Sequence, residues 1–235
     1  MKTLILFIIV AFSFTSCDPL LTSVLNSGPL TTTEVGNGLK EALKQGITKG
    51  STQASKVDGY FGNALLKILV PPEMQKVEQK LRSLGFNKLM DDFTLSLNRG
   101  AEEAAKTARP IFVDAITAMT IPDAWNILKG SDDAATMYLK NNTGQKLYTA
   151  FKPVIQNALQ KVNATKYYKD VINTYNQIPF VTQVNPDLED YVTNKAIDGL
   201  FLLIKKEEVN IRNNASARVN EILKKVFTEA NMGRK

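Results

Sequence analysis

The feature of this sequence that most limits its fold is the helical spacing of its apolar residues, which continues along nearly the whole chain after residue 30. The first stretch shows it clearly, with apolar residues at steps of four: Val35, Leu39, Leu43 and Ile47. That spacing lines one face of an α-helix. No stretch shows the sustained two-residue alternation of a half-buried strand. We therefore expect residues 31–235 to form one all-α globular domain of about ten helices.

Capping residues, glycines and prolines divide this region into helices. Thr31 and Glu34, like Thr120 and Asp123, have the spacing of a capping box, and we expect Ser131 and Asn214 to cap two further helices. We expect Gly85 to end a helix, Pro110 to break or kink one, and Pro153 to interrupt the helix that begins at Thr143. The predicted helices cover residues 31–54, 72–84, 87–107, 111–119, 121–129, 132–141, 143–162, 166–177, 187–212 and 215–230, and 187–212 is expected to be the longest. The glycines of VDGYFGN (57–63) indicate a loop, whereas ALLKILV (64–70) is compatible with helix or strand.

The N-terminus has the layout of a secretory signal. Lys2 precedes an apolar stretch from Leu4 to Phe14 that is too short to span a bilayer, and small residues follow it. Phe14-Thr15-Ser16-Cys17 resembles the lipobox of bacterial lipoproteins, with Phe14 where leucine is usual. The resemblance implies that residues 1–16 are removed and that Cys17, the only cysteine, is acylated. Residues 17–30 would then be the lipidated cysteine and a tether, whose thirteen residues from Asp18 to Leu30 reach ~40 Å when extended.

Composition excludes several classes of function. The chain has no histidine and no cysteine other than Cys17, so histidine-based catalytic triads and Cys/His zinc sites are excluded from residues 31–235. The formal net charge is +6, but lysines and glutamates interleave along the helices, as on solvated faces. We therefore expect no nucleic-acid partner and no cofactor.

Two groups of polar residues are candidates for a site. Asp132 and Asp133 follow Gly130 and could bind a cation or act as acid and base, although Ser131 with acidic residues in the first turn is also a common helix cap. Asn98 and Arg99 precede Glu102 and Glu103. We expect Arg99 to form a surface pair with Glu103 four residues later, and the alternative is a buried Arg99 that holds a distant carboxylate.

Asp198 lies in the apolar run AIDGLFLLI, with Lys195 one turn before it. If this face is buried, the carboxylate requires a partner, because an isolated buried charge is too costly. We expect an interior ion pair that fixes helix packing, and the alternative is an acid that faces a ligand. Gly199 has no side chain and could let another helix approach closely. The run itself is read as a buried core helix, because it is too short to span a bilayer.

Six blocks of sequence, in order, resemble the bacterial DUF4197 family of uncharacterised proteins over about residues 36–228. They are GLKEALKQG, VEQKLRSLGFNKLMDDFTLSLNRGAEEAA, PIFVDAITAMTI, ILKGSDDAATMYL, YVTNKAIDGLF and EEVNIRNNASARVNEILKKVF. The resemblance implies an exported helical protein without an established activity. It supplies no catalytic residues.

Three functions remain open at this stage. The first is a non-enzymatic lipoprotein of the bacterial cell envelope, anchored to a membrane through Cys17 and acting on an envelope protein or in envelope structure. The second is a module that binds an apolar or amphipathic small ligand in a cavity between helices, with candidate lining by Phe61, Trp125, Tyr138, Phe151, Tyr167, Tyr168 and Phe180. The third is a hydrolase or metal-dependent enzyme that uses Asp114, Asp132, Asp133 or Asp198. A candidate polar site therefore comprises Asn98, Arg99, Asp114, Asp132, Asp133 and Asp198.

The lipid anchor makes a direct prediction. Cys17→Ser should move the protein from the membrane pellet to the soluble fraction of the envelope, because serine cannot form the thioether and each buried CH₂ of lipid is worth ~0.8 kcal/mol. Ser16→Ala, which keeps a small residue before the cysteine, is the control and should stay in the pellet. A Cys17→Ser protein that still sediments with membranes would contradict the anchor.

Overall fold

A computed structural model describes residues 31–232, apart from residues 162, 178, 181–182 and 186. Within these residues the chain forms nine α-helices and two short 3₁₀ helices, with no strand. They are α2 (Thr32–Ala54), η1 (Pro72–Met74), α3 (Gln75–Ser83), α4 (Asn87–Ala105), α5 (Ala108–Ala118), α6 (Ile121–Lys129), α7 (Ala134–Gln160), α8 (Ala164–Asn176), α9 (Leu188–Asn213), η2 (Ala215–Ala217) and α10 (Glu221–Met232). The predicted all-α fold is confirmed. The predicted signal peptide, the predicted acylation site Cys17 and the predicted tether lie outside the described residues.

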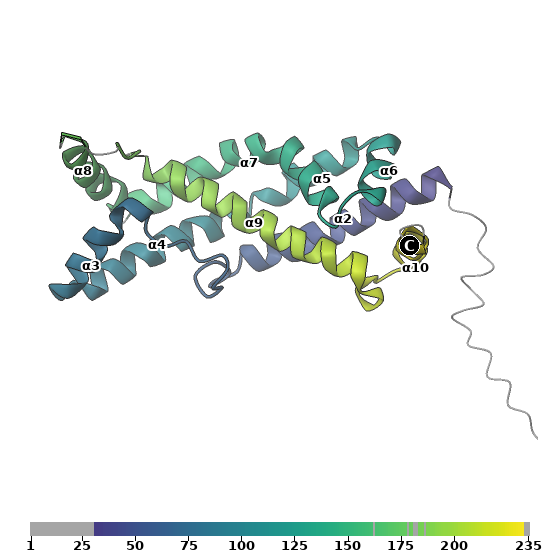
Figure 1. Ribbon diagram of the computed structural model, residues 1–235, viewed down its shortest axis with the longest axis horizontal. Coiled ribbons are helices and arrows are strands. Elements are labelled where there is room, and N and C mark those ends of the chain that lie inside the picture. The colour runs from purple at the N-terminus through teal and green to yellow at the C-terminus, as the bar shows by residue number, and fades with distance from the viewer. Residues whose placement is uncertain (1–30, 162, 178, 181–182, 186, 233–235) are drawn as a thin grey trace, which may run out of the picture.

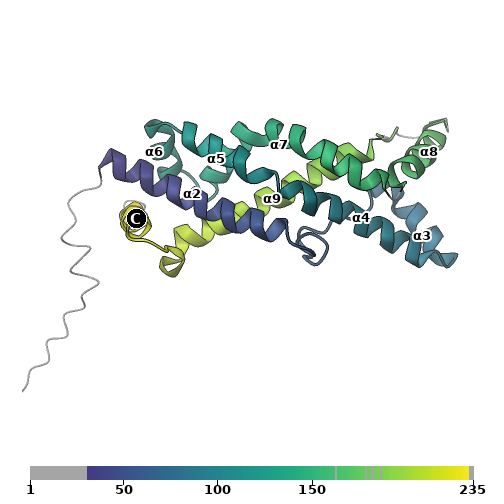
Figure 2. The same cartoon turned by 180° about the vertical axis from the view of Figure 1, so that it is seen from behind.

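Helix α9 is the central element of an elongated body (Figures 1 and 2). It packs against α7 on one side and against α2 and α4 on the other. Helices α2 and α4 follow one another along the long axis (Figure 2). The start of α2, α6 and α10 lie at one end of the body, and α3 and α8 lie at the other.

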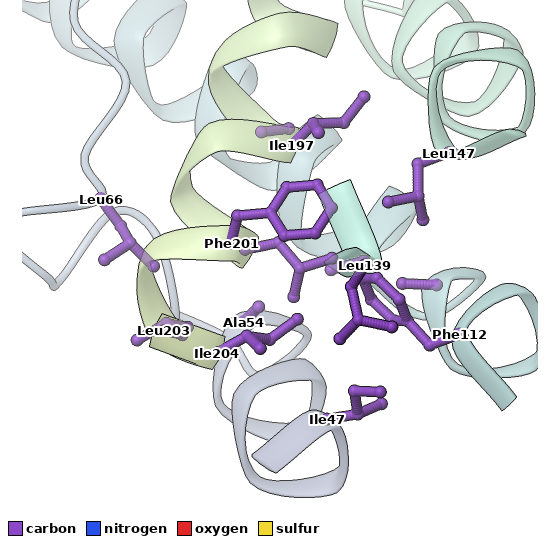
Figure 3. Close-up of a cluster of buried hydrophobic side chains, with 14 of the residues drawn as sticks. Ile47, Ala54, Leu66, Phe112, Leu139, Leu147, Ile197, Phe201, Leu203 and Ile204 are labelled. Atoms are coloured by element: carbon purple, nitrogen blue, oxygen red, sulfur yellow. The ribbon is translucent and has the colours of Figure 1, made fainter. Parts of the chain in front are cut away.

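The hydrophobic core is built where α9 meets α2, α5 and α7. The ring of Phe201 on α9 lies edge-to-face against Phe112 on α5, with centroids 5.7 Å apart. Leu139 of α7 and Ile47 of α2 close the same cluster (Figure 3), and all four side chains are buried. Each of these four residues lies on the buried face of its own helix. Burial of these apolar faces against one another holds the helices together.

Several predicted helix ends are confirmed by their contacts. The Thr31 hydroxyl accepts a hydrogen bond from the Glu34 amide at 3.2 Å, and the Glu34 carboxylate accepts one from the Thr31 amide at 2.9 Å. Hydrogen bonds from Lys225 and Thr31 lower the pKa of Glu34 to about 2. Thr120 and Asp123 form the second capping box at the start of α6. Gly85 follows α3 with a positive φ of 91°, a conformation that suits glycine.

Other predicted ends are wrong. Residues 132–141 and 143–162 were expected to form two helices, but α7 runs unbroken from Ala134 to Gln160 with Pro153 inside it. Thr143 does not start a helix, since its hydroxyl donates to the Leu139 carbonyl at 2.7 Å within the buried face. As a result α7, at 27 residues, is longer than the 26-residue α9. The predicted break at Pro110 is confirmed, since α4 ends at Ala105 and α5 begins at Ala108. Pro110 lies in the first turn of α5, where its missing N–H would have had no acceptor.

Two predicted caps also differ. The Asn214 side chain accepts from the Ser216 amide and so caps η2, while the Asn220 side chain accepts from the Leu223 amide at the start of α10. Ser131 does not cap α7, because its hydroxyl donates to Asp133 and the helix begins at Ala134 without a local side-chain cap.

The cap of α7 comes from α9 instead. The buried Glu208 carboxylate accepts hydrogen bonds from the amides of Ala135 and Thr136 at 2.9 and 2.8 Å. It also forms a 2.9 Å ion pair with Arg212, which is only 2% exposed. Arg212 in turn donates to the carbonyl of Ile127 near the end of α6. One buried ion pair therefore satisfies the end of α6 and the start of α7 together.

No single helix among the described residues is long and apolar enough to cross a bilayer. Helices α5 and α6 are long and apolar enough only when taken together, and the chain bends by 105° between them.

The buried pair predicts a large effect of a single substitution. Glu208→Ala should lower the free energy of unfolding by about 3–5 kcal/mol, because it leaves Arg212 buried without its counter-charge and removes the cap of α7. Urea unfolding followed by circular dichroism measures this change.

Glu221→Ala is the matched control. Glu221 pairs with Lys224, and its side chain is 83% exposed, so the loss should stay below about 1 kcal/mol. Equal losses in the two variants would show that Glu208 does not hold the junction.

Candidate functional site

The loop between α2 and η1 (residues 55–71) leaves helical structure. From residue 65 to residue 70 the buried side chains are Leu66, Ile68 and Val70, each at most 4% exposed, and they alternate with Leu65, Lys67 and Leu69, which are exposed. This two-residue period is that of an extended chain. Residues 64–70, whose sequence was compatible with helix or strand, therefore become extended after the turn that begins at Asn63. Residues 67–70 are the extended segment.

Asn98 on α4 holds one edge of the extended segment. Its side chain is fully buried, its carbonyl oxygen accepts from the Ile68 amide, and its amide group donates to the Ile68 carbonyl, both at 2.8 Å. A neighbouring antiparallel strand would make the same pair of hydrogen bonds. Asn98 thus replaces a strand partner in a protein whose described residues contain no strand.

The turn before the extended segment is held by Glu102, one helical turn after Asn98. The Glu102 carboxylate is buried and accepts from the amides of Tyr60 and Phe61 at 3.1 and 3.2 Å. Arg99 pairs with Glu102 at 2.5 Å and with Asp58 of the loop at 2.8 Å.

The predicted Arg99–Glu103 pair is wrong, because Glu103 pairs with Lys106. The alternative, an arginine that holds a distant carboxylate, is correct for Asp58. Arg99 is, however, 37% exposed rather than buried.

The loop reaches α9 through Tyr60. Its buried ring lies over Gly199, where an added Cβ would come within 2.8 Å of the ring, and its hydroxyl donates to the Ala196 carbonyl. Burial raises the pKa of Tyr60, so the hydroxyl keeps the proton that this bond needs. Gly199 therefore does permit a close approach, but the partner is a tyrosine ring from the loop and not a helix.

An open groove lies between the extended segment and α9. Its volume is about 330 Å³, and residues 65–70, Pro72 and Gln75 form one side of it. Tyr191, Lys195, Asp198, Gly199 and Leu202 of α9 form the other side. Burial and the Glu73 carboxylate raise the pKa of Tyr191, whose hydroxyl donates to the Leu69 carbonyl across the groove at 3.3 Å. The groove combines exposed apolar side chains with the charged groups of Lys67, Lys195 and Asp198.

The predicted buried ion pair of Asp198 is wrong. Its side chain is 60% exposed and contacts Lys140 of α7 at 3.4 Å. The apolar neighbours Ile197 and Leu200 face the core, whereas Asp198 falls on the side of α9 that lines the groove. The buried charges of α9 are instead Glu189, Glu208 and Arg212.

The remaining predicted residues are spread over the surface. Asp114 is exposed on α5, and Asp132 is exposed before α7. Asp133 pairs with Lys205 of α9 at 2.7 Å, and hydrogen bonds from Lys205 and Ser131 lower its pKa. Of the six candidates, Asn98, Arg99 and Asp198 thus gather around the loop and its groove, while Asp114, Asp132 and Asp133 do not.

The aromatic residues expected to line a cavity do not line the groove. Phe151 and Tyr168 are buried in the core, Trp125 and Tyr138 pack against it, and Phe180 is fully exposed. The Lys67 ammonium lies over the ring of Phe61, 4.2 Å from the ring centroid. The side chain of Tyr167 is outside the described set.

Sequence reasoning missed Glu102, Glu208 and Tyr191 as functional or structural anchors. For Glu102 a signal was present, because it follows Asn98 by four residues and so shares its helix face. The i,i+4 spacing of Glu208 to Arg212 is local, but nothing local marks Glu208 as the cap of α7, because the backbone amides it accepts from are 72 and 73 residues away. Among the described residues, no three or more His, Cys, Asp or Glu side chains are grouped so that they could hold a metal ion.

The fold and this site define an all-α protein in which buried polar side chains hold an extended segment beside an open groove. The chain belongs to the DUF4197 family, whose model, described as a protein of unknown function, matches residues 29–228. The predicted family membership is confirmed. No curated protein and no solved structure matches the chain significantly.

The Asn98 contacts predict a local effect. Asn98→Leu should leave the Ile68 amide and carbonyl without partners, at a cost of about 1–3 kcal/mol for each unsatisfied buried group. Amide hydrogen exchange should accelerate at Ile68 far more than in α7.

Asn142→Leu is the control. Asn142 lies on the exposed face of α7 and donates only to the Tyr138 carbonyl, so exchange at Ile68 should not change. An unchanged Ile68 amide in Asn98→Leu would show that Asn98 does not fix the segment.

Proposed function

We propose that this protein is a lipid-anchored component of the bacterial cell envelope that binds a partner protein in the groove between the extended segment and α9, without catalysing a reaction. The observation that carries the proposal is the groove itself. It is open, its Leu65 and Leu69 side chains are exposed, and the loop that forms it is held by buried hydrogen bonds to α4 and α9.

The contacts of the predicted polar residues support a binding role. Asn98 and Arg99 are engaged in shaping the loop, and Asp133 is paired with Lys205. These interactions stabilise the fold and direct the side chains at other protein groups. The side chains that do face the groove are mostly apolar or cationic, as in a recognition surface with a few orienting charges.

The position of the groove fits an anchored protein. The predicted tether joins the body at Thr31, and the loop follows the other end of α2, a helix of 23 residues. At 1.5 Å per residue α2 is about 35 Å long. With Cys17 in a membrane, the attachment point and the groove would lie at opposite ends of α2, so the anchor would leave the groove open to envelope proteins.

A small amphipathic ligand is the second candidate for the same groove. The mixture of exposed leucines with Lys67 and Lys195 favours it, because an apolar chain with an acidic head would match both. Native mass spectrometry of protein purified from its own membrane would show the retained mass of such a ligand.

Site-specific photo-crosslinking tests the proposal in cells. A photoreactive phenylalanine analogue at Leu65, a groove residue that is 63% exposed, should yield a discrete crosslinked protein in the bacterium that makes this chain. The matched control is the same analogue at Met137, which is 49% exposed on α7 and does not line the groove. Identical crosslinking patterns at the two positions would overturn the assignment of the groove.

A further inference from the structure

The extended segment has two backbone edges, and the fold uses one of them more fully than the other. In an extended chain the N–H and C=O of one residue point to the same side, and those of its neighbours point to the opposite side. Both groups of Ile68 are bonded to Asn98. The Lys67 carbonyl and both backbone groups of Leu69 therefore face away from α4 and toward the groove, whereas the Lys67 amide donates to the Asn63 carbonyl at 2.8 Å within the turn.

This second edge carries hydrogen-bonding groups that the fold uses little. The Leu69 carbonyl receives only the 3.3 Å hydrogen bond from Tyr191. No described residue accepts from the Leu69 amide or donates to the Lys67 carbonyl. Leu69 is 54% exposed, and Lys67 is exposed as well. An unpaired extended edge is a template for another extended chain.

The side chains around the edge suit a peptide with apolar and acidic residues. Leu65, Leu69 and Leu202 offer apolar contact. Lys67 and Lys195 add two positive charges, whereas the negative charge of Asp198 is already in contact with Lys140. Glu73 is the other nearby carboxylate, close to Tyr191. The uncompensated charge of the groove is therefore positive and matches a carboxylate in the bound chain.

We propose that the groove binds an extended, acidic–apolar peptide segment of a partner protein, which adds as a strand to the free edge of residues 67–70. This inference rests on the proposed binding function and names the form of the bound partner. The partner's backbone accepts from the Leu69 amide and donates to the Lys67 carbonyl, and its alternate side chains enter the groove. Main-chain hydrogen bonds supply affinity and the groove supplies specificity, as in other cases of strand addition.

Backbone complementarity favours a peptide over an acyl chain. An acyl chain could lie on the leucines and place its carboxylate near a lysine, but it has no groups for the Leu69 amide and the Lys67 carbonyl. A peptide satisfies all of these contacts. Because Asn98 and Glu102 hold the loop in position before binding, the segment loses little conformational freedom when the peptide adds.

The test begins with a displayed library of random heptapeptides selected on the folded body, residues 18–235. Enriched sequences should combine apolar residues with Asp or Glu, and synthetic versions should bind with a Kd measurable by fluorescence anisotropy. Two N-methylated versions of the best peptide are compared, one methylated at the odd and one at the even backbone nitrogens. One version should bind at least about tenfold more weakly, because it loses hydrogen bonds to the edge, and the other should bind almost unchanged.

Two substitutions at one position separate backbone from side-chain recognition. Leu69→Pro removes an N–H that no described residue bonds and keeps a conformation allowed in an extended chain. Leu69→Ala keeps the N–H but has the smaller side chain. We expect the peptide to bind Leu69→Pro at least about tenfold more weakly than Leu69→Ala, from the loss of one hydrogen bond. Circular dichroism establishes that both variants are folded, and the N-methylated peptides test the same bond without changing the protein.

Several outcomes would overturn the inference. Equal binding of Leu69→Pro and Leu69→Ala, with no effect of N-methylation on either register, would show that only side chains are read. If the library enriches no peptide, the edge does not bind peptides. If laurate binds tightly and displaces the peptides, the groove binds an acyl chain. If the wild type forms a dimer that Leu69→Pro abolishes, the edge binds a second copy of the chain. In those cases the proposed function survives if the crosslink at Leu65 persists, and it fails separately if that crosslink matches the Met137 control.

Discussion

The structure depends on one constraint, which is that buried backbone N–H and C=O groups need partners wherever a helix ends or the chain leaves helical structure. Two helices supply those partners. Glu208 and Arg212 of α9 satisfy the start of α7 and the end of α6, and Asn98 and Glu102 of α4 satisfy the loop after α2. Each unsatisfied group would cost about 1–3 kcal/mol. Buried polar residues are therefore what fixes the positions of the connections around an apolar core.

The same contacts create the groove. An irregular loop would normally lie on the surface with water as its partner, but Asn98, Glu102 and Tyr60 draw this one down between α4 and α9. One edge of the extended segment is used in this anchoring, and the other is left facing Tyr191 and Lys195. A preformed site of this kind is suited to binding, because the ordering of the loop is achieved by the fold itself.

Asp198 shows where reasoning from a single helix fails. An acid inside an apolar run indicates burial, yet helical rotation of 100° per residue turns it away from the core between Ile197 and Leu200. Glu102, Glu189 and Glu208 are buried instead. The difference is set by which neighbouring helix covers each face. The local run does not contain that information.

The helical class, the capping boxes at Thr31 and Thr120 and the turn at Gly85 could be predicted from the sequence, because each depends on residues within a few positions of one another. The family could be predicted from blocks of sequence spread over most of the chain. The sequence also supports the prediction of an acylated Cys17. The cap of α7, the extended path of residues 67–70 and the groove depend on tertiary packing. Asn98 and Ile68 are 30 residues apart, and Glu208 and Thr136 are 72 apart. Hydrogen bonds at such separations form only when packing brings their helices together, so no local pattern can record them.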